Sequence, residues 1–378
     1  MLPNESDFFQ LPTDNGYLGM LPQPGQSVET LESPQLLLDL DVVDANLRRM
    51  LDAFQGRPVE VRVHFKSLKC AGLARHLAAR GVRGFLCAKL NEAEVLADAG
   101  LTDLFVANQI VGPIKLRRLA ELARRAKVRV CVDDADNVDQ MSRAAQAAAS
   151  EIGVLVEVDI GMNRCGVEPG EAAVRLARHI ASRPGLRFVG LQGYDGHLQM
   201  LPDAGERRAK CLQGLEKLVA TRRLIERSGL PVAVVTGAGT GTWEFVGFHE
   251  GVTEIQPGSF LLMDCAYHAV RPEFGCALSI LATVISRRPG RYVLDAGSKA
   301  ISRDFGTPVI KDRPAERVAK LAEEHTLVDT EADVHIGELR QVLPAHCCAT
   351  MNLHRTCVAL RGGRVEAVWP IEASGRYD

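Results

Sequence analysis

The sequence predicts an α/β protein, built from a (β/α)8 barrel of the TIM type and a mostly-β C-terminal domain. Short apolar runs alternate with amphipathic segments for about 220 residues, and eight such β/α units are typical of a closed parallel barrel. After Ser259 the pattern changes to strands separated by turns. A doubly wound open sheet is the alternative arrangement for the same alternation.

The expected barrel strands are short apolar runs, each followed by a segment of helical periodicity. Residues 36–41 are apolar and lead into a helix that Asp44 could cap and that runs to Phe54. After this helix, the eight barrel strands are expected at 59–65, 84–88, 103–107, 128–132, 154–159, 188–192, 232–236 and 252–256. The helices between them are expected at 70–80, 91–99, 113–126, 136–149, 170–183 and 203–228.

The C-terminal part is expected to be a sheet that the segment before the first barrel helix joins. Its strands are expected at 276–285, 291–294, 338–343, 356–360 and 364–369, with one helix at 316–324. The predicted division is an N-terminal segment 1–35, partly packed on the β domain, a cofactor-binding barrel 36–265 and a β domain 266–378.

Composition excludes several classes of function. A formal net charge of −2 opposes nucleic-acid binding. No apolar run is long enough to span a bilayer, and residues 1–35 lack the features of a signal peptide. Most of the ten cysteines lie in apolar runs, which is typical of reduced thiols in a cytoplasmic protein. Neither nucleic acid nor a membrane is therefore an expected partner.

The strand at 59–65 has one apolar and one cationic face. Its residues alternate between the apolar Val61, Val63 and Phe65 and the basic Arg62, His64 and Lys66. In a barrel the active site lies at the C-terminal ends of the strands, so Lys66 is a candidate reactive amine. The alternative is an edge strand whose cationic face is solvated.

Three other stretches carry candidate chemistry. Residues 236–242 are rich in Gly and Thr and, with Gly258 and Ser259, predict a phosphate site at the last barrel loops; a flexible loop is the alternative. Arg164 follows the strand at 154–159 and could neutralise an oxyanion or hydrogen-bond an aromatic cofactor, or could be a surface arginine in a turn.

His346 and Cys348 form the third candidate. On a strand they would share one face, and imidazole with thiolate suits zinc. A third ligand would have to come from elsewhere, the nearest candidates being Glu323, His325 and His354. The alternative is a core histidine beside structural thiols.

Taken together, these motifs resemble one family over the chain from about residue 36 to its end. The sequence is similar to D-threonine aldolases, 3-hydroxy-D-aspartate aldolases and D-serine dehydratases, which are fold-type III, alanine-racemase-like enzymes that use pyridoxal 5'-phosphate. The motifs are residues 35–41, His64-x-Lys66-x-x-Lys69, Lys89-x-x-Glu92-Ala-Glu94, residues 106–113, 130–134, 158–161 with 164–166, 191–194 and 236–242, Gln256-x-Gly-Ser259, Met263-Asp264, Asp295-Ala-Gly297, His346-x-Cys348 and Trp369-Pro370.

The resemblance implies a role for each candidate residue. Lys66 resembles the Schiff-base lysine, with Lys69 as its competitor, and His346 and Cys348 resemble a divalent-metal pair for Zn, or alternatively Mn or Mg. Catalytic roles are expected for Lys66, Tyr194 and His197. Contacts with the cofactor are expected for His64, Lys66, Arg164, Tyr194, Thr236, Gly239, Thr240, Gln256, Gly258, Ser259 and Tyr267.

The implied activity is a lyase reaction on D-3-hydroxy amino acids, in which retro-aldol cleavage gives glycine and an aldehyde. Three departures leave alternatives open: Leu68 and Met200 stand where relatives often carry His, and Cys348 stands where aldolases usually carry Asp. A zinc-dependent dehydratase that forms a keto acid and ammonia is the main alternative. An amino-acid racemase and a non-catalytic pyridoxal-phosphate-binding protein are lesser ones. The family also implies a homodimer.

Overall fold

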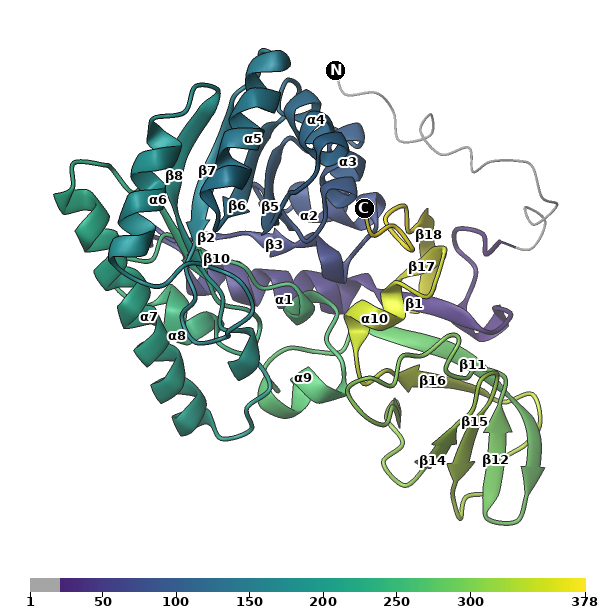
Figure 1. Ribbon diagram of the computed structural model, residues 1–378. Coiled ribbons are helices and arrows are strands. Elements are labelled where there is room, and N and C mark those ends of the chain that lie inside the picture. The colour runs from purple at the N-terminus through teal and green to yellow at the C-terminus, as the bar shows by residue number, and fades with distance from the viewer. Residues whose placement is uncertain (1–20) are drawn as a thin grey trace.

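The computed structural model describes residues 21–378 and consists of a barrel and a mostly-β domain (Figure 1). Residues 1–20, which belong to the expected N-terminal segment, lie outside the described part of the chain. Residues 25–28 of that segment hydrogen-bond to residues 363–365 of the β domain.

The barrel wall is a parallel sheet in the order β2-β10-β9-β8-β7-β6-β5-β4-β3. β2 and β3 are halves of one strand interrupted at Arg62; β2 pairs with β10 and β3 pairs with β4, so the sheet closes. The (β/α)8 fold is therefore confirmed, and the sheet is not open. The strands are β2 (Glu60–Val61), β3 (Val63–His64), β4 (Phe85–Cys87), β5 (Asp103–Gln109), β6 (Lys127–Val132), β7 (Ile152–Glu157), β8 (Leu186–Gly193), β9 (Val234–Gly237) and β10 (Glu254–Ile255).

Helices surround this wall (Figure 1) and end within a few residues of the predicted ranges. The first of them begins earlier than expected, because Asp39 rather than Asp44 caps it by accepting from the backbone N–H of Asp41 and Val42. The helices are α1 (Leu40–Ala53), α2 (Ala71–Ala78), α3 (Leu90–Asp98), α4 (Pro113–Leu122), α5 (Ala135–Ala147), α6 (Glu171–Ala181), α7 (Ala204–Arg227) and α8 (Trp243–Gly247).

The second sheet has the order β14-β15-β12-β11-β1-β17-β18, and β16 pairs with β11 and β13. β1 precedes the barrel in the chain but lies here, antiparallel to β11 and parallel to β17. The strands are β1 (Gln35–Asp39), β11 (Leu278–Arg288), β12 (Arg291–Leu294), β13 (Val309–Ile310), β14 (Arg317–Leu321), β15 (Thr326–Asp329), β16 (Leu339–Leu343), β17 (Thr356–Arg361) and β18 (Arg364–Pro370). Two short helices, α9 (Cys265–Val270) and α10 (Cys347–Met351), lie where this domain meets the barrel (Figure 1).

The helix predicted at 316–324 is wrong, because this segment forms β14, which pairs antiparallel with β15. Val318 and Leu321 are buried and their spacing of three residues resembles that of a helix face. The pairing register shifts between Val318 and Lys320, and such a bulge shifts the alternation of a strand by one residue. The bulge therefore explains the misleading spacing.

Within residues 21–378, no helix is both long enough and apolar enough to cross a membrane. The ten cysteines, all between residues 70 and 357, are unpaired.

Candidate active site

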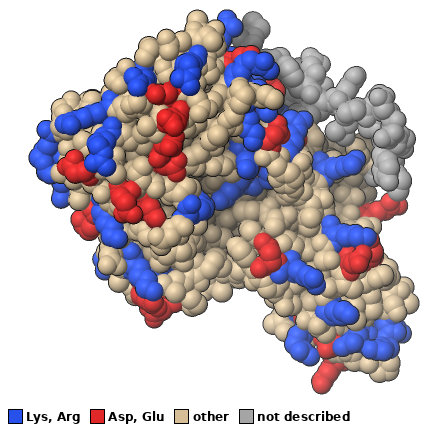
Figure 2. Space-filling view, in the orientation of Figure 1, with Lys and Arg blue, Asp and Glu red and all other residues tan. Residues whose placement is uncertain are grey.

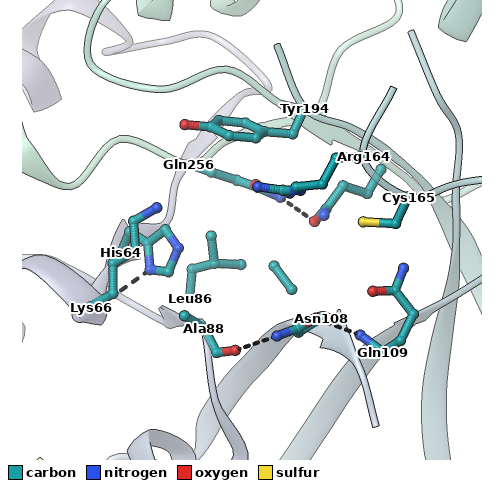
Figure 3. Close-up of a pocket in the computed structure, with 12 residues that line it drawn as sticks. His64, Lys66, Leu86, Ala88, Asn108, Gln109, Arg164, Cys165, Tyr194 and Gln256 are labelled. Carbon is teal, nitrogen blue, oxygen red and sulfur yellow. Dashed lines mark hydrogen bonds between the residues drawn. The ribbon is translucent and has the colours of Figure 1, made fainter. Parts of the chain in front are cut away.

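A cavity of about 330 Å³ lies at the C-terminal ends of the barrel strands. Figure 3 shows Tyr194, Arg164 and Gln256 along one side of it and Ala88, Asn108 and Gln109 along the other. Five residues predicted for the site line this cavity: His64, Lys66, Arg164, Tyr194 and Gln256. Figure 2 shows the hollow between the barrel and the β domain, with basic side chains on its barrel side.

Lys66 lies in a 3-10 turn, Phe65–Ser67, that directly follows β3. His64 caps this turn, because its Nδ1 atom accepts from the backbone N–H of Lys66 at 3.4 Å. The Lys66 Nζ atom lies 5.8 Å from the centre of the Tyr194 ring. In the described part of the chain, no carboxylate forms an ion pair with this ammonium group. Lys66 thus presents an unpaired amine to the cavity.

Lys69, the other lysine of the motif, is buried in a different setting. Its Nζ atom lies 3.2 Å from Glu92 Oε1 and 3.3 Å from the carbonyl oxygen of Ala373. These two partners hold the ammonium group of Lys69 away from the cavity. A structural role therefore fits Lys69 better than a reactive one.

The ionisable groups that face the cavity are shifted by burial. Burial, and next the Lys66 charge, hold the pKa of His64 well below its usual range, so this imidazole is neutral near pH 7. Burial also raises the pKa of Tyr194, while Lys66 and Arg164 oppose the shift. The Arg164 guanidinium lies 5.5 Å from the same ring, so Tyr194 lies within 6 Å of two cationic groups.

A row of hydrogen bonds crosses the barrel lumen beside the cavity. The Gln256 amide donates to Thr236 Oγ1 at 2.9 Å and to Gln192 Oε1 at 2.8 Å, and the Gln192 amide donates to Glu157 at 3.1 Å. Burial raises the pKa of Glu157, against the effect of Arg164. Asn108, Gln109, Cys165 and Gln192 also line the cavity, although they were not among the predicted site residues. Their position at strand ends was the signal that could have identified them.

The two predicted phosphate loops meet beside the Lys66 turn. Thr240 Oγ1 accepts from the backbone N–H of Phe260 at 3.0 Å, which joins the loops. A Cβ atom added at Gly258 would lie 2.6 Å from Ser67 Oγ, so this loop directly contacts the lysine turn. Among residues 21–378, no acceptor is hydrogen-bonded to the backbone N–H groups of Thr240, Gly258 and Ser259. Unpaired N–H groups of this kind can bind a phosphate.

His346 and Cys348 lie at the start of α10 and not on a strand, which corrects the predicted backbone. His346 is the extended N-cap residue, so its side chain can still turn toward that of Cys348. Cys348 Sγ lies 3.0 Å from Ser67 Oγ and 3.5 Å from Ser259 Oγ, which places it against the lysine turn and a phosphate loop. Hydrogen bonding from Cys347, and then His346, holds the pKa of Cys348 well below its usual range.

The other metal ligands considered from sequence are not brought to this pair. His354 Nε2 lies 2.8 Å from the carbonyl oxygen of Ala300, and Glu323 forms an exposed ion pair with Lys299. Residues 21–378 contain no group of three His, Cys, Asp or Glu side chains that could hold a metal ion. His346 and Cys348 are thus a two-donor pair.

Two further predicted residues lie outside the lining of the cavity. Tyr267 is buried in α9, where burial and the neighbouring Tyr194 and Cys348 raise its pKa well above the usual range. His197 is exposed in the turn Gly196–Leu198, and the structure does not bring it to the cavity. Sequence alone could not show that Tyr267 is buried and His197 is exposed, because both residues follow barrel strands.

Two family models match the chain: "Alanine racemase, N-terminal domain" over residues 38–265 and "Putative serine dehydratase domain" over residues 277–360. The chain is 38% identical to D-threonine aldolase of Arthrobacter sp, covering 93% of this chain and 95% of that protein. It is 35% identical to 3-hydroxy-D-aspartate aldolase of Paracoccus denitrificans (strain Pd 1222), with the same coverage. The crystal structure of D-threonine aldolase from Filomicrobium marinum is similar, with a TM-score of 0.91 and 40% identity, over 93% of this chain and 98% of that chain.

These matches extend over both the barrel and the β domain and confirm the resemblance read from the motifs. The chain therefore belongs to the family with an alanine-racemase-type N-terminal domain, in the group that includes D-threonine aldolase and 3-hydroxy-D-aspartate aldolase.

Proposed function

We propose that the protein is a pyridoxal-phosphate-dependent lyase that cleaves D-3-hydroxy amino acids to glycine and an aldehyde. The observation that carries this proposal is the position of Lys66, whose unpaired amine faces a cavity beside two loops with unpaired backbone N–H groups. Both aldolase relatives cover nearly the whole chain, which supports the same reaction class.

The residues present fit pyridoxal phosphate. Lys66 would attach the cofactor aldehyde, and the free N–H groups of Thr240, Gly258 and Ser259 would bind its phosphate. When bound, the cofactor supplies an electron sink for breaking a bond at the substrate Cα atom. Arg164 would compensate negative charge at the opposite side of the cavity.

Tyr194 and Lys66 are the groups best placed to hold or move a proton. Tyr194 lies against both Lys66 and Arg164, and its raised pKa keeps its hydroxyl protonated near pH 7. His64 is neutral and fixes the turn that carries Lys66. The exposed position of His197 does not support its expected catalytic role.

We also propose a divalent metal at His346 and Cys348. Imidazole and a thiol of lowered pKa are donors that zinc prefers, and the pair lies against the lysine turn. Such a metal would supply a Lewis acid beside the substrate. Zinc suits this donor set best, with Mn or Mg as the alternatives, and two protein donors leave positions open for substrate or water.

A dehydratase that forms a keto acid and ammonia is the second candidate. The match of the β domain to a "Putative serine dehydratase domain", and the thiol at position 348, favour it. A racemase would need a second base on the opposite face of the substrate, and Tyr267, which lies near Tyr194 and Cys348, is the candidate for it.

Product analysis on a panel of D-3-hydroxy amino acids tests the proposal. Glycine and an aldehyde are expected from D-threonine or 3-hydroxy-D-aspartate, with loss of turnover after chelation. Ammonia and a keto acid would establish the dehydratase instead. No turnover, despite a bound cofactor that absorbs near 420 nm, would establish a non-catalytic binding protein.

Two further expectations are proposals as well. The ten unpaired thiols support a cytoplasmic location, because thiols persist in a reducing compartment. The family membership supports a homodimer, which the molecular mass in solution would test.

A further inference from the structure

We infer that Asp304, together with the ring of Phe305, positions His346 for metal binding. These two residues belong to the loop 302–305, which lies in the β domain and is far in the sequence from α10. The inference rests on the metal site of the proposed function, and it adds a positioning residue to the two proposed ligands.

The first contact is a hydrogen bond to the imidazole. His346 Nδ1 lies 2.6 Å from Asp304 Oδ2. An ionised carboxylate can only accept, so Nδ1 carries a proton, and Nε2 is the ring nitrogen that is left to bind a metal. A carboxylate that holds a metal-binding histidine in this way fixes its tautomer and its ring orientation.

The second contact is a ring stack. The rings of Phe305 and His346 are parallel to within 4°, with their centroids 3.9 Å apart. Phe305 is 45% exposed, so its ring gains little from burial in the core. The stack instead limits rotation of the imidazole about its χ2 torsion.

The loop is itself fastened to the helix that carries the ligands. The backbone N–H of Ser302 donates to Thr350 Oγ1 at 3.1 Å, and this hydroxyl donates to the carbonyl oxygen of His346 at 2.8 Å. Ser302 Oγ also donates to Asp304 Oδ1, which orients the carboxylate. Loop 302–305 and the start of α10 therefore form one hydrogen-bonded unit.

This support matters because the site has few protein donors. Within residues 21–378 no third His, Cys, Asp or Glu side chain joins His346 and Cys348. When only two side chains hold a metal, a freely rotating imidazole loses a large part of the binding energy, because its orientation must be fixed on binding. We therefore expect the affinity for the metal to depend on Asp304.

The test is zinc affinity, measured on the full chain loaded with pyridoxal phosphate and stripped of metal. Zn²⁺ is titrated against a competing chelator for the wild type and for Asp304→Ala, Asp304→Asn and Phe305→Leu. Asp304→Ala is expected to weaken zinc binding about 10- to 100-fold, the range seen for outer partners of metal ligands. Asp304→Asn should lose less, because its amide oxygen still accepts from Nδ1, and Phe305→Leu should also weaken binding.

Asp312→Asn is the matched control, since Asp312 is exposed in the same domain and has no side-chain partner in the described chain. Co²⁺ replaces zinc in a second titration, where a thiolate-to-cobalt absorption band reports Cys348 as a ligand. The band should reach full intensity in Asp304→Ala, but at higher Co²⁺ concentration.

The outcomes separate the inference from the proposed function. If the wild type binds zinc and Asp304→Ala binds it within twofold, the inference is overturned and the metal site stands. If the wild type binds neither metal, the site and the inference both fail, whereas the pyridoxal-phosphate lyase remains testable by its products.

Discussion

The two lysines of the motif differ in what surrounds their amines. Lys66 has no carboxylate partner in the described chain, whereas Lys69 is paired with Glu92. We predict that Lys66→Ala abolishes the covalent adduct that borohydride traps, since only Lys66 can reach the bound cofactor from the cavity. Mass spectrometry of the reduced protein measures the adduct. An adduct that persists in Lys66→Ala and disappears in Lys69→Ala would reverse the assignment.

Lys69 itself should contribute to the free energy of unfolding. Glu92 is 1% exposed, and without Lys69 its charge would be left buried and unpaired. We predict that Lys69→Met lowers the free energy of unfolding by about 3–5 kcal/mol, the usual cost of removing one partner of a buried ion pair. Urea unfolding measures this loss, with the exposed Lys217→Met as the control. A change under 1 kcal/mol would show that the pair contributes little.

The sequence could predict the cavity residues near the strand ends, but not the contacts between side chains that are far apart in the chain. The alternation of residues 61–66 places His64 and Lys66 on one face, and the barrel places that face at the active site. The pairing of Lys69 with Glu92, 23 residues away, depends on how α3 packs and has no local signal. The contact of Cys348 with Ser67, 281 residues apart, is of the same kind.

At the scale of elements, short helices and bulged strands are where prediction from sequence failed. The regular β/α alternation identified the barrel, because each unit repeats the same pattern. β14 was mistaken for a helix because its bulge puts Val318 and Leu321 three residues apart on one buried side. α10 was mistaken for a strand because five residues are too few to show a helical period.

The loop that follows β9 is held in shape by one side chain from the previous β/α unit. Gln199 accepts from the backbone N–H of Gly241 at 2.7 Å and donates to Thr242 Oγ1 at 2.9 Å and Asp195 Oδ1 at 2.8 Å. A Cβ atom at Gly239 would lie 2.5 Å from its Oε1 atom, so the loop is packed directly on this amide. Gln199 thus determines the shape of the proposed phosphate loop without facing the cavity.

We predict that Gln199→Leu weakens pyridoxal phosphate binding. Loss of these hydrogen bonds should cost about 1–2 kcal/mol, or about a 5- to 30-fold rise in Kd. Titration of the apoprotein with the cofactor, followed by absorbance, measures the change. The exposed Gln213→Leu on α7 is the matched control and should bind like the wild type. Equal Kd values for both variants would mean that the loop keeps its shape without the amide.

At the scale of the whole molecule, the proposed site depends on the contact between the barrel and the β domain. The barrel supplies Lys66 and the proposed phosphate loops, and the β domain supplies His346 and Cys348 through α10. β1, the first strand of the described chain, lies inside the second sheet. The chain then enters the barrel through α1, and this connection fixes the two parts together (Figure 1). The two proposed halves of the chemistry therefore require both domains in one arrangement.

The opposite end of the barrel is closed by a cluster of charged residues, in which Arg62, Arg129 and Glu254 are buried and Asp103 is partly exposed. Arg62 lies 2.7 Å from Glu254 and 2.9 Å from Asp103, and Arg129 lies 3.3 Å and 3.1 Å from the same two carboxylates. Arg62 interrupts the strand at the junction of β2 and β3, where the sheet closes on β10. The cluster thus joins the seam where β2 pairs with β10 to Asp103 on β5 and Arg129 on β6.

We predict that Arg62→Met destabilises the whole protein by about 3–5 kcal/mol, because it leaves the buried Glu254 with too little compensating charge. Urea unfolding measures the loss, and Arg48→Met, an exposed residue on α1, is the control. Because the cluster lies at the end of the barrel opposite to Lys66, the folded fraction of Arg62→Met should keep the cofactor affinity of the wild type. Weakened cofactor binding without a loss of stability would show instead that the closure of the barrel shapes the active site directly.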